Sequence, residues 1–255
     1  IGILDGDGKI IYEPFYRVAL KSHIAMELGK MPTVIQEIRL FSERENDQLE
    51  ELRSIRCDAL VCIAPDQEQE PLLRRIQQYR PVVVVDTTLP GMTCIELDRY
   101  RKGRVLGEAL LAEGRRRVLF AQNERYYATT FQGCRDVFRE AGIEIPEEHF
   151  FCNEINGLET LLQSGYRPQA IAPSLENFHA IAALLRRYGI DLYEECRMVT
   201  FMFKPENMPE PVMLFTFPFE EFGKETVRQI RNRLENPSLP PERIVFDFNY
   251  KMTTV

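Results

Sequence analysis

Continuous apolar runs alternate along the chain with segments whose apolar residues recur every three or four positions. The runs at 58–64 (DALVCIA) and 81–85 (PVVVV) are typical of strands that are buried on both faces, as in a parallel sheet. Residues 67–79 between them have the spacing of a helix, and so do residues 14–28 near the start. This order predicts strand–helix–strand units.

The same rhythm continues to the end of the chain. We expect further strands at residues 1–4, 33–38, 93–97, 118–121, 149–152, 169–172, 198–203, 212–217 and 244–248. We expect further helices after a cap at Ser42 and at residues 100–113, 130–141, 155–163, 178–188 and 222–234. The fold class is therefore α/β with mostly parallel sheet and helices on both faces. Functional loops should lie at the carboxyl ends of the strands.

Composition places the chain among ordinary globular proteins. It has 255 residues, 44% of them hydrophobic and 28% charged, with a net charge of −7. A domain that binds nucleic acid by itself usually carries a basic patch, which this acidic sequence lacks. The run Arg115-Arg116-Arg117 is interpreted as positive charge at the end of a helix, facing its dipole, rather than as a phosphate site.

Cysteine and histidine placement predicts no metal site and no cofactor. The six cysteines form no Cys-x-x-Cys pair and are interpreted as small buried hydrophobic residues in a reducing, cytoplasmic compartment. No apolar run is long enough for a membrane helix. The chain begins at Ile1 inside a predicted strand, so we expect its natural N-terminus to lie further upstream.

Several polar and aromatic residues follow predicted strands and are candidates for ligand binding. Asp5 opens a glycine-rich turn that a small ligand could approach. Phe15 and Tyr16 are adjacent on a helix, so one can join the core while the other faces a cleft. Asp98 could bind ligand, cap a helix, or do both. Tyr126 lies in a mixed polar and aromatic stretch that is typical of a ligand cleft.

A series of short motifs, in order along the whole chain, resembles the effector-binding domain of the lac repressor family of bacterial transcription regulators. The motifs are Ile1-Gly2-Ile3, Glu13-Pro14-Phe15-Tyr16, residues 43–64, residues 81–91, Leu97-Asp98 with Gly103, Gly133 with Ala141-Gly142-Ile143, Phe217-Pro218 with Gly223, and Leu239-Pro240-Pro241.

The resemblance implies the periplasmic-binding-protein type I fold, with two α/β subdomains and a small-molecule effector in the cleft between them. The expected subdomains are residues 1–117 with 218–240, and residues 118–217 with 241–255. It further implies a homodimer that is not an enzyme and that controls operator DNA through a separate N-terminal DNA-binding head.

The sequence departs from the family pattern at residues that hold the effector. Thr130 stands where the family has an arginine that grips the effector. The family's Asn-Asp pair falls on Ser174-Leu175 or on Leu175-Glu176, and its Gly-Phe-Asp becomes Thr200-Phe201-Met202. We therefore hypothesise that the chain does not bind a common hexose in the usual way. The ligand would be more apolar or differently decorated, unless effector response has been lost. The candidate site then comprises Asp5, Phe15, Tyr16, Asp98, Tyr126, Thr130, Glu176 and Phe201.

Two other functions are compatible with an α/β fold. A solute receptor of a sugar transporter would be exported to the periplasm, where six scattered cysteines would be a liability. An enzyme on a doubly wound sheet is disfavoured, because the sequence has no P-loop, nucleophile elbow or complete dinucleotide fingerprint.

Overall fold

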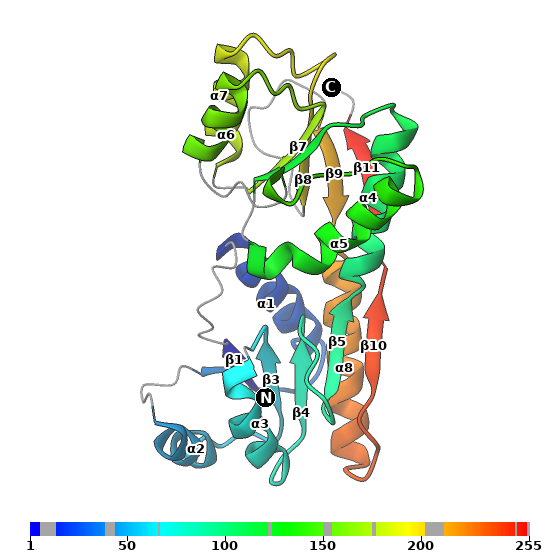
Figure 1. Ribbon diagram of the computed structural model, residues 1–255. Coiled ribbons are helices and arrows are strands. Elements are labelled where there is room, and N and C mark those ends of the chain that lie inside the picture. The colour runs from blue at the N-terminus through cyan, green and yellow to red at the C-terminus, as the bar shows by residue number, and fades with distance from the viewer. Residues whose placement is uncertain are drawn as a thin grey trace. The chain divides into compact units, whose positions relative to one another are not determined.

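The computed structural model describes residues 1–5, 14–38, 44–65, 67–121, 124–149, 155–174, 177–201, 212–247 and 249–253 (Figure 1). The chain divides into two compact units. The first comprises Ile1–Leu97 and Pro218–Phe246, and the second comprises Asp98–Phe217 and Asp247–Val255. The chain therefore passes between the units after Leu97, Phe217 and Phe246.

The first unit is built on a six-stranded sheet in the order β10-β5-β4-β3-β1-β2, in which every neighbouring pair is parallel. Its strands are β1 (Gly2–Asp5), β2 (Gln36–Ile38), β3 (Leu60–Ile63), β4 (Val82–Val85), β5 (Thr93–Leu97) and β10 (Arg243–Phe246). All four residues of β3 and of β4 are buried, as their continuous apolar runs predict.

Helices cover both faces of this sheet. They are α1 (Pro14–Leu28), α2 (Glu45–Ser54), the short 3-10 helix η1 (Gln67–Gln69), α3 (Glu70–Gln77) and α8 (Phe219–Glu235). The α1 helix packs on α8, and α2 packs on α3, which gives one helical pair for each face. Gly223 lies at the α1–α8 contact, where a Cβ atom would come within 2.9 Å of the His23 carbonyl oxygen.

The second unit is built on a five-stranded sheet in the order β11-β9-β8-β7-β6. Its strands are β6 (Val118–Ala121), β7 (Ala170–Pro173), β8 (Arg197–Phe201), β9 (Val212–Thr216) and β11 (Asn249–Thr253). The pairs from β6 to β9 are parallel, and β11 runs antiparallel to β9.

Two helical pairs also cover this sheet. The helices are α4 (Arg99–Ala112), α5 (Glu124–Glu140), the 3-10 helix η2 (Glu147–His149), α6 (Ile155–Gln163) and α7 (Phe178–Arg187). Leu119 joins the buried cluster that contains residues of α6 and α7. The ring of Phe120, the next residue, lies 4.3 Å from that of Phe131 on α5. This alternation along β6 separates the two helical layers.

The predicted α/β class with helices on both faces is confirmed, but the division of the chain differs from the predicted one in two places. Helix α4 was expected in the first subdomain, within residues 1–117, and it belongs to the second unit because it packs along α5. Residues 241–246 were expected in the second subdomain. They belong to the first unit because β10 pairs with β5.

The last strands and two short elements also differ from expectation. Residues 244–248 were predicted to close the chain, and the sequence alone did not reveal β11 after them. The β2 strand is shorter than the predicted segment 33–38. Helix α2 is preceded by Arg44 without a side-chain cap, and Ser42 lies outside the described residues. A strand was predicted at residues 149–152. His149 is instead the last residue of η2, and residues 150–152 lie outside the described residues.

Candidate functional site

Two neighbouring strands of the first unit end in an unusual backbone conformation. Ala64 follows β3 with a φ of 47°, and Asp86 follows β4 with a φ of 64°. These residues are side by side, because Ile63 pairs with Val85 and the Ala64 amide donates to the Val85 carbonyl at 2.7 Å. Left-handed backbone in residues other than glycine costs about 1 kcal/mol or more, and it collects at functional sites. Asp86 is almost fully buried, which makes this carboxyl edge a candidate ligand surface that the sequence analysis missed.

Asp98 caps helix α4. Its Oδ1 accepts a hydrogen bond from the backbone amide of Arg101 at 2.7 Å. The capping role that the sequence offered for Asp98 is therefore confirmed, whereas its role in ligand binding stays a prediction.

The α4 and α5 helices of the second unit cross at glycines. A Cβ atom at Gly103 would lie 1.8 Å from the carbonyl oxygen of Thr130, and one at Gly133 would lie 2.2 Å from that of Tyr100. Only hydrogen fits at these two positions. The crossing holds Thr130 in a buried place, with 1% of its surface exposed.

Polar side chains join the two helices beside this crossing. The Tyr100 hydroxyl donates to Asp136 at 2.8 Å, and Gln132 and Arg139 donate to the same carboxylate at 2.8 and 2.6 Å. The Tyr100 hydrogen bond, followed by the charge of Arg139, lowers the pKa of Asp136. These contacts fix the angle between α4 and α5, and with it the place of Thr130.

Phe201 ends β8 and is buried against two very different neighbours. Its ring centroid lies 5.5 Å from that of Phe215 on β9. The Lys102 ammonium nitrogen lies 3.6 Å from the Phe201 ring centroid, in the geometry of a cation–π contact. Lys102 is only 5% exposed, so α4 places a buried positive charge at the carboxyl end of β8. The sequence analysis did not select Lys102.

The remaining predicted site residues cannot be placed as side chains. Asp5 lies in β1, Phe15 and Tyr16 lie in α1, and Tyr126 lies in α5, but their side chains are outside the described part of the structure. Glu176 lies outside the described residues altogether. Of the predicted set, the structure thus describes the side chains of Asp98, Thr130 and Phe201, all in the second unit.

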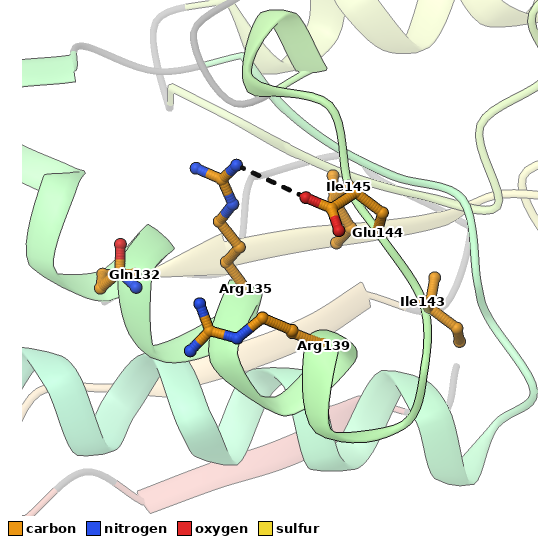
Figure 2. A pocket seen from close by; sticks show the side chains of 6 residues that line it. All are labelled: Gln132, Arg135, Arg139, Ile143, Glu144 and Ile145. Carbon is orange, nitrogen blue, oxygen red and sulfur yellow. Dashed lines mark ion pairs between the residues drawn. The ribbon is translucent and has the colours of Figure 1, made fainter.

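A hollow of about 260 Å³ lies on the second unit beside the end of α5 (Figure 2). Figure 2 shows the Arg135 guanidinium turned toward the Glu144 carboxylate, 3.9 Å away. Because a crossover helix runs antiparallel to its strands, the end of α5 lies near the amino ends of β6 and β7. This hollow is therefore at the opposite edge of the sheet from Phe201, where ligands bind less commonly in such folds.

A second hollow, of about 420 Å³, involves the arginine run that the sequence analysis weighed as a phosphate site. The Arg115 guanidinium donates to the backbone carbonyls of Gln169, Glu194 and Glu195 at 3.2, 3.3 and 2.8 Å. Arg117 donates to the carbonyl of Arg167 at 2.7 Å. Arg115 and Arg117 thus hold loops together at the amino ends of the strands. The predicted structural role of the run is supported, although the partners are neighbouring loops rather than the end of α4.

Cysteines in the described residues behave as small core groups. Cys62, Cys94, Cys134 and Cys196 are buried, and Cys57 is half-buried. Burial raises the pKa of the Cys134 thiol and raises the pKa of Cys196 to about 12, so neither is a reactive thiolate. Within the described residues no group of three or more His, Cys, Asp or Glu side chains could hold a metal ion. In the same part of the chain, no helix is both long and apolar enough to cross a membrane.

Comparison with solved structures reveals the same fold in several regulators. A complex of the transcriptional regulator CelR with cellobiose is 18% identical, with a TM-score of 0.79 over 98% of this chain and 82% of that one. A transcription regulator from Lactobacillus plantarum is 15% identical, with a TM-score of 0.79 over 98% and 97% of the two chains. The regulator CcpA of Lactococcus lactis is 15% identical, with a TM-score of 0.75 over 98% and 97%.

Sequence comparison identifies the family. No curated protein matches the chain by sequence. Residues 13–184 match the family described as periplasmic binding proteins and the sugar-binding domain of the LacI family. The match covers more than half of the chain and includes residues of both units. The chain therefore belongs to the family of periplasmic binding proteins and sugar-binding domains of the LacI family.

Proposed function

We propose that this chain is the sensor of a cytoplasmic transcription regulator, which binds a small-molecule effector at the carboxyl ends of its parallel strands and controls an attached DNA-binding head. The family match over residues 13–184 carries the proposal. Two buried groups are consistent with ligand binding at those edges: Asp86, which follows β4 in the first unit, and Lys102, which lies on the ring of Phe201 at the end of β8 in the second. The similar solved structures named above are regulators.

A transporter receptor with the same fold is the second candidate, and the cysteines speak against it. Cys94, Cys134 and Cys196 are buried thiols, which suit a reducing compartment better than the periplasm. The residues encoded upstream of Ile1 in the intact gene distinguish the two. A DNA-binding head there supports the regulator, and a secretory signal peptide would exclude it.

Effector binding is tested by a thermal-shift screen of neutral sugars, sugar acids, sugar phosphates and purines. A ligand at a hundred times its Kd stabilises the folded protein by about 2.7 kcal/mol, which corresponds to a rise in Tm of roughly 5–10 °C for a chain of this size. We expect at least one ligand to give such a shift, and a plain hexose to give none. Sub-millimolar binding of a plain hexose would disprove the expectation that hexoses are rejected.

We also propose that the chain forms a homodimer through the outer face of α1. Val18 and Met26 on that face are 58% and 59% exposed, and Val34 before β2 is 84% exposed. The ion pair of Lys21 with Glu37, at 3.1 Å, brings the segment after Val34 beside α1. Apolar side chains gathered in this way suit a symmetric contact in which the same patch meets itself.

Replacing both Val18 and Met26 by aspartate is expected to raise the dimer dissociation constant tenfold or more, because each copy would bury two new charges against their symmetry mates. Sedimentation velocity across a concentration series measures the change. Tyr193→Asp is the matched control, because Tyr193 is 47% exposed in the second unit and should leave the dimer intact. An unchanged dissociation constant in the double variant would exclude this face.

A further inference from the structure

Lys102 is a buried amine that lies on an aromatic ring at the carboxyl edge of the second sheet. It is on the first turns of α4, 5% exposed, with its ammonium nitrogen 3.6 Å from the centroid of the Phe201 ring. Lysine is among the residues least often buried, because removing its charge from water is costly. The Phe201 ring face offsets part of that cost. Phe201 is the last residue of β8, so the ammonium lies at the carboxyl edge of the sheet.

A buried hydroxyl lies at the same helix crossing. Thr130 is 1% exposed, and its Oγ1 has no hydrogen-bond partner among the described residues. Gly103, the residue after Lys102, touches the Thr130 backbone, since a Cβ there would lie 1.8 Å from the Thr130 carbonyl oxygen. Buried hydroxyls are nearly always hydrogen-bonded, so the unpaired hydroxyl of Thr130, on the helix that packs against the turn carrying Lys102, points to a partner that the described chain does not supply.

The arginines elsewhere in this unit differ from Lys102 in their place. The Arg115 guanidinium donates to three backbone carbonyls, and Arg139 donates to Asp136 at 2.6 Å. Both belong to the amino edge of the sheet or to the helix pair, and both hold the fold together. Lys102 differs from them in lying at the carboxyl edge of β8, where ligands of parallel sheets bind.

We propose that Lys102 is the charge-recognition residue of the effector site, and that the effector is a small molecule with an anionic group, either a phosphate or a carboxylate. The Thr130 hydroxyl donates a second hydrogen bond to that group. Both side chains are donors, and an anionic oxygen accepts from both. Exclusion of water makes such a pair stronger than it would be at the surface. This inference rests on the proposed effector-binding function and names the ligand class that it leaves open.

Matched ligand sets test the inference on the intact chain. Glucose, glucuronate and glucose 6-phosphate share a ring and differ in charge, as do ribose and ribose 5-phosphate, and inorganic phosphate serves as the bare anion. Calorimetry with the wild-type protein should give a Kd at least tenfold lower for a charged member than for its neutral partner. Whether the phosphate or the carboxylate member binds tighter identifies the anion.

Four variants separate binding from folding. Lys102→Met keeps the length and apolar stem of the side chain, and it should weaken the charged ligand tenfold or more while changing the neutral one less than about twofold. Arg101→Met, which removes an exposed charge one residue earlier, should change neither. Thr130→Val should weaken the charged ligand about fivefold, yet raise the Tm without ligand, because a methyl group replaces an unpaired buried hydroxyl. Lys102→Arg provides a second test in case Lys102→Met does not fold. Because it keeps the positive charge, it should still bind the charged ligand more tightly than the neutral one.

The results distinguish failure of the anionic-effector inference from failure of the proposed effector-binding function. A neutral ligand that binds as tightly as its charged partner, or a charged ligand unaffected by both Lys102→Met and Thr130→Val, overturns the inference and leaves effector binding standing. Failure of every sugar, sugar acid, sugar phosphate and purine to bind the wild-type protein overturns effector binding itself, and the inference with it.

Discussion

The Gly103→Ala variant should lose about 3 kcal/mol of unfolding free energy. The added Cβ atom would lie 1.8 Å from the carbonyl oxygen of Thr130, 2.8 Å from its carbonyl carbon and 2.9 Å from the amide nitrogen of Cys134. All three are backbone atoms, so no side-chain rotation relieves the overlap and α4 must move away from α5. Urea denaturation followed by far-UV circular dichroism measures the loss, and hydrogen exchange should locate it in α4 and α5.

Gly114→Ala is the control for this variant. Gly114 follows the same helix with a φ of 74°, and a Cβ atom added there would have no other atom within 4 Å. Alanine there is strained but meets nothing, and we expect a loss of about 1 kcal/mol. If Gly103→Ala costs no more than Gly114→Ala, the two helices do not cross as closely as described.

Replacing Arg233 by alanine should destabilise the first unit by about 3 kcal/mol. Arg233 lies on α8 and is only 6% exposed. Its Nε donates to the Thr93 hydroxyl at 2.6 Å, and one terminal nitrogen donates to the Pro240 carbonyl at 2.9 Å. The guanidinium therefore joins α8 to the start of β5 and to the loop before β10. Removal of the Arg233 side chain leaves a cavity, and the Pro240 carbonyl loses its hydrogen-bond donor.

Arg231→Ala separates this network from the general loss of an arginine on α8. Arg231 lies on the exposed side of the same helix, and its loss should cost about 0.5 kcal/mol or less. Urea denaturation of both variants provides the comparison. Equal losses would mean that the buried bridge of Arg233 contributes little to stability, and Thr93→Val should then also be neutral.

Local patterns in the sequence predicted most of the elements. The runs 58–64 and 81–85 contain the buried strands β3 and β4, and helix α1 has the predicted bounds. These assignments succeed because strand and helix periodicity is a property of neighbouring residues. The family resemblance also came from local motifs in register, and the match over residues 13–184 confirms it.

The division into units could not be obtained in that way. Whether α4 belongs with β5 before it or with α5 after it depends on the packing of Gly103 on Thr130 and of Gly133 on Tyr100. The assignment of β10 to the first unit depends on its pairing with β5. No local pattern in the sequence indicates that pairing. Contacts between distant segments are settled by shape and hydrogen bonding in the folded chain.

For the candidate site, the sequence by itself determined which residues differ from the family, and it drew attention to Thr130 and Phe201. Only the tertiary structure added Asp86 and Lys102. Lys102 has the pattern of an ordinary helix lysine until α4 packs against the sheet and its ammonium lies on the Phe201 ring. The candidate site thereby gains a positive charge that the sequence did not indicate, because burial, unlike residue type, is a property of the whole fold.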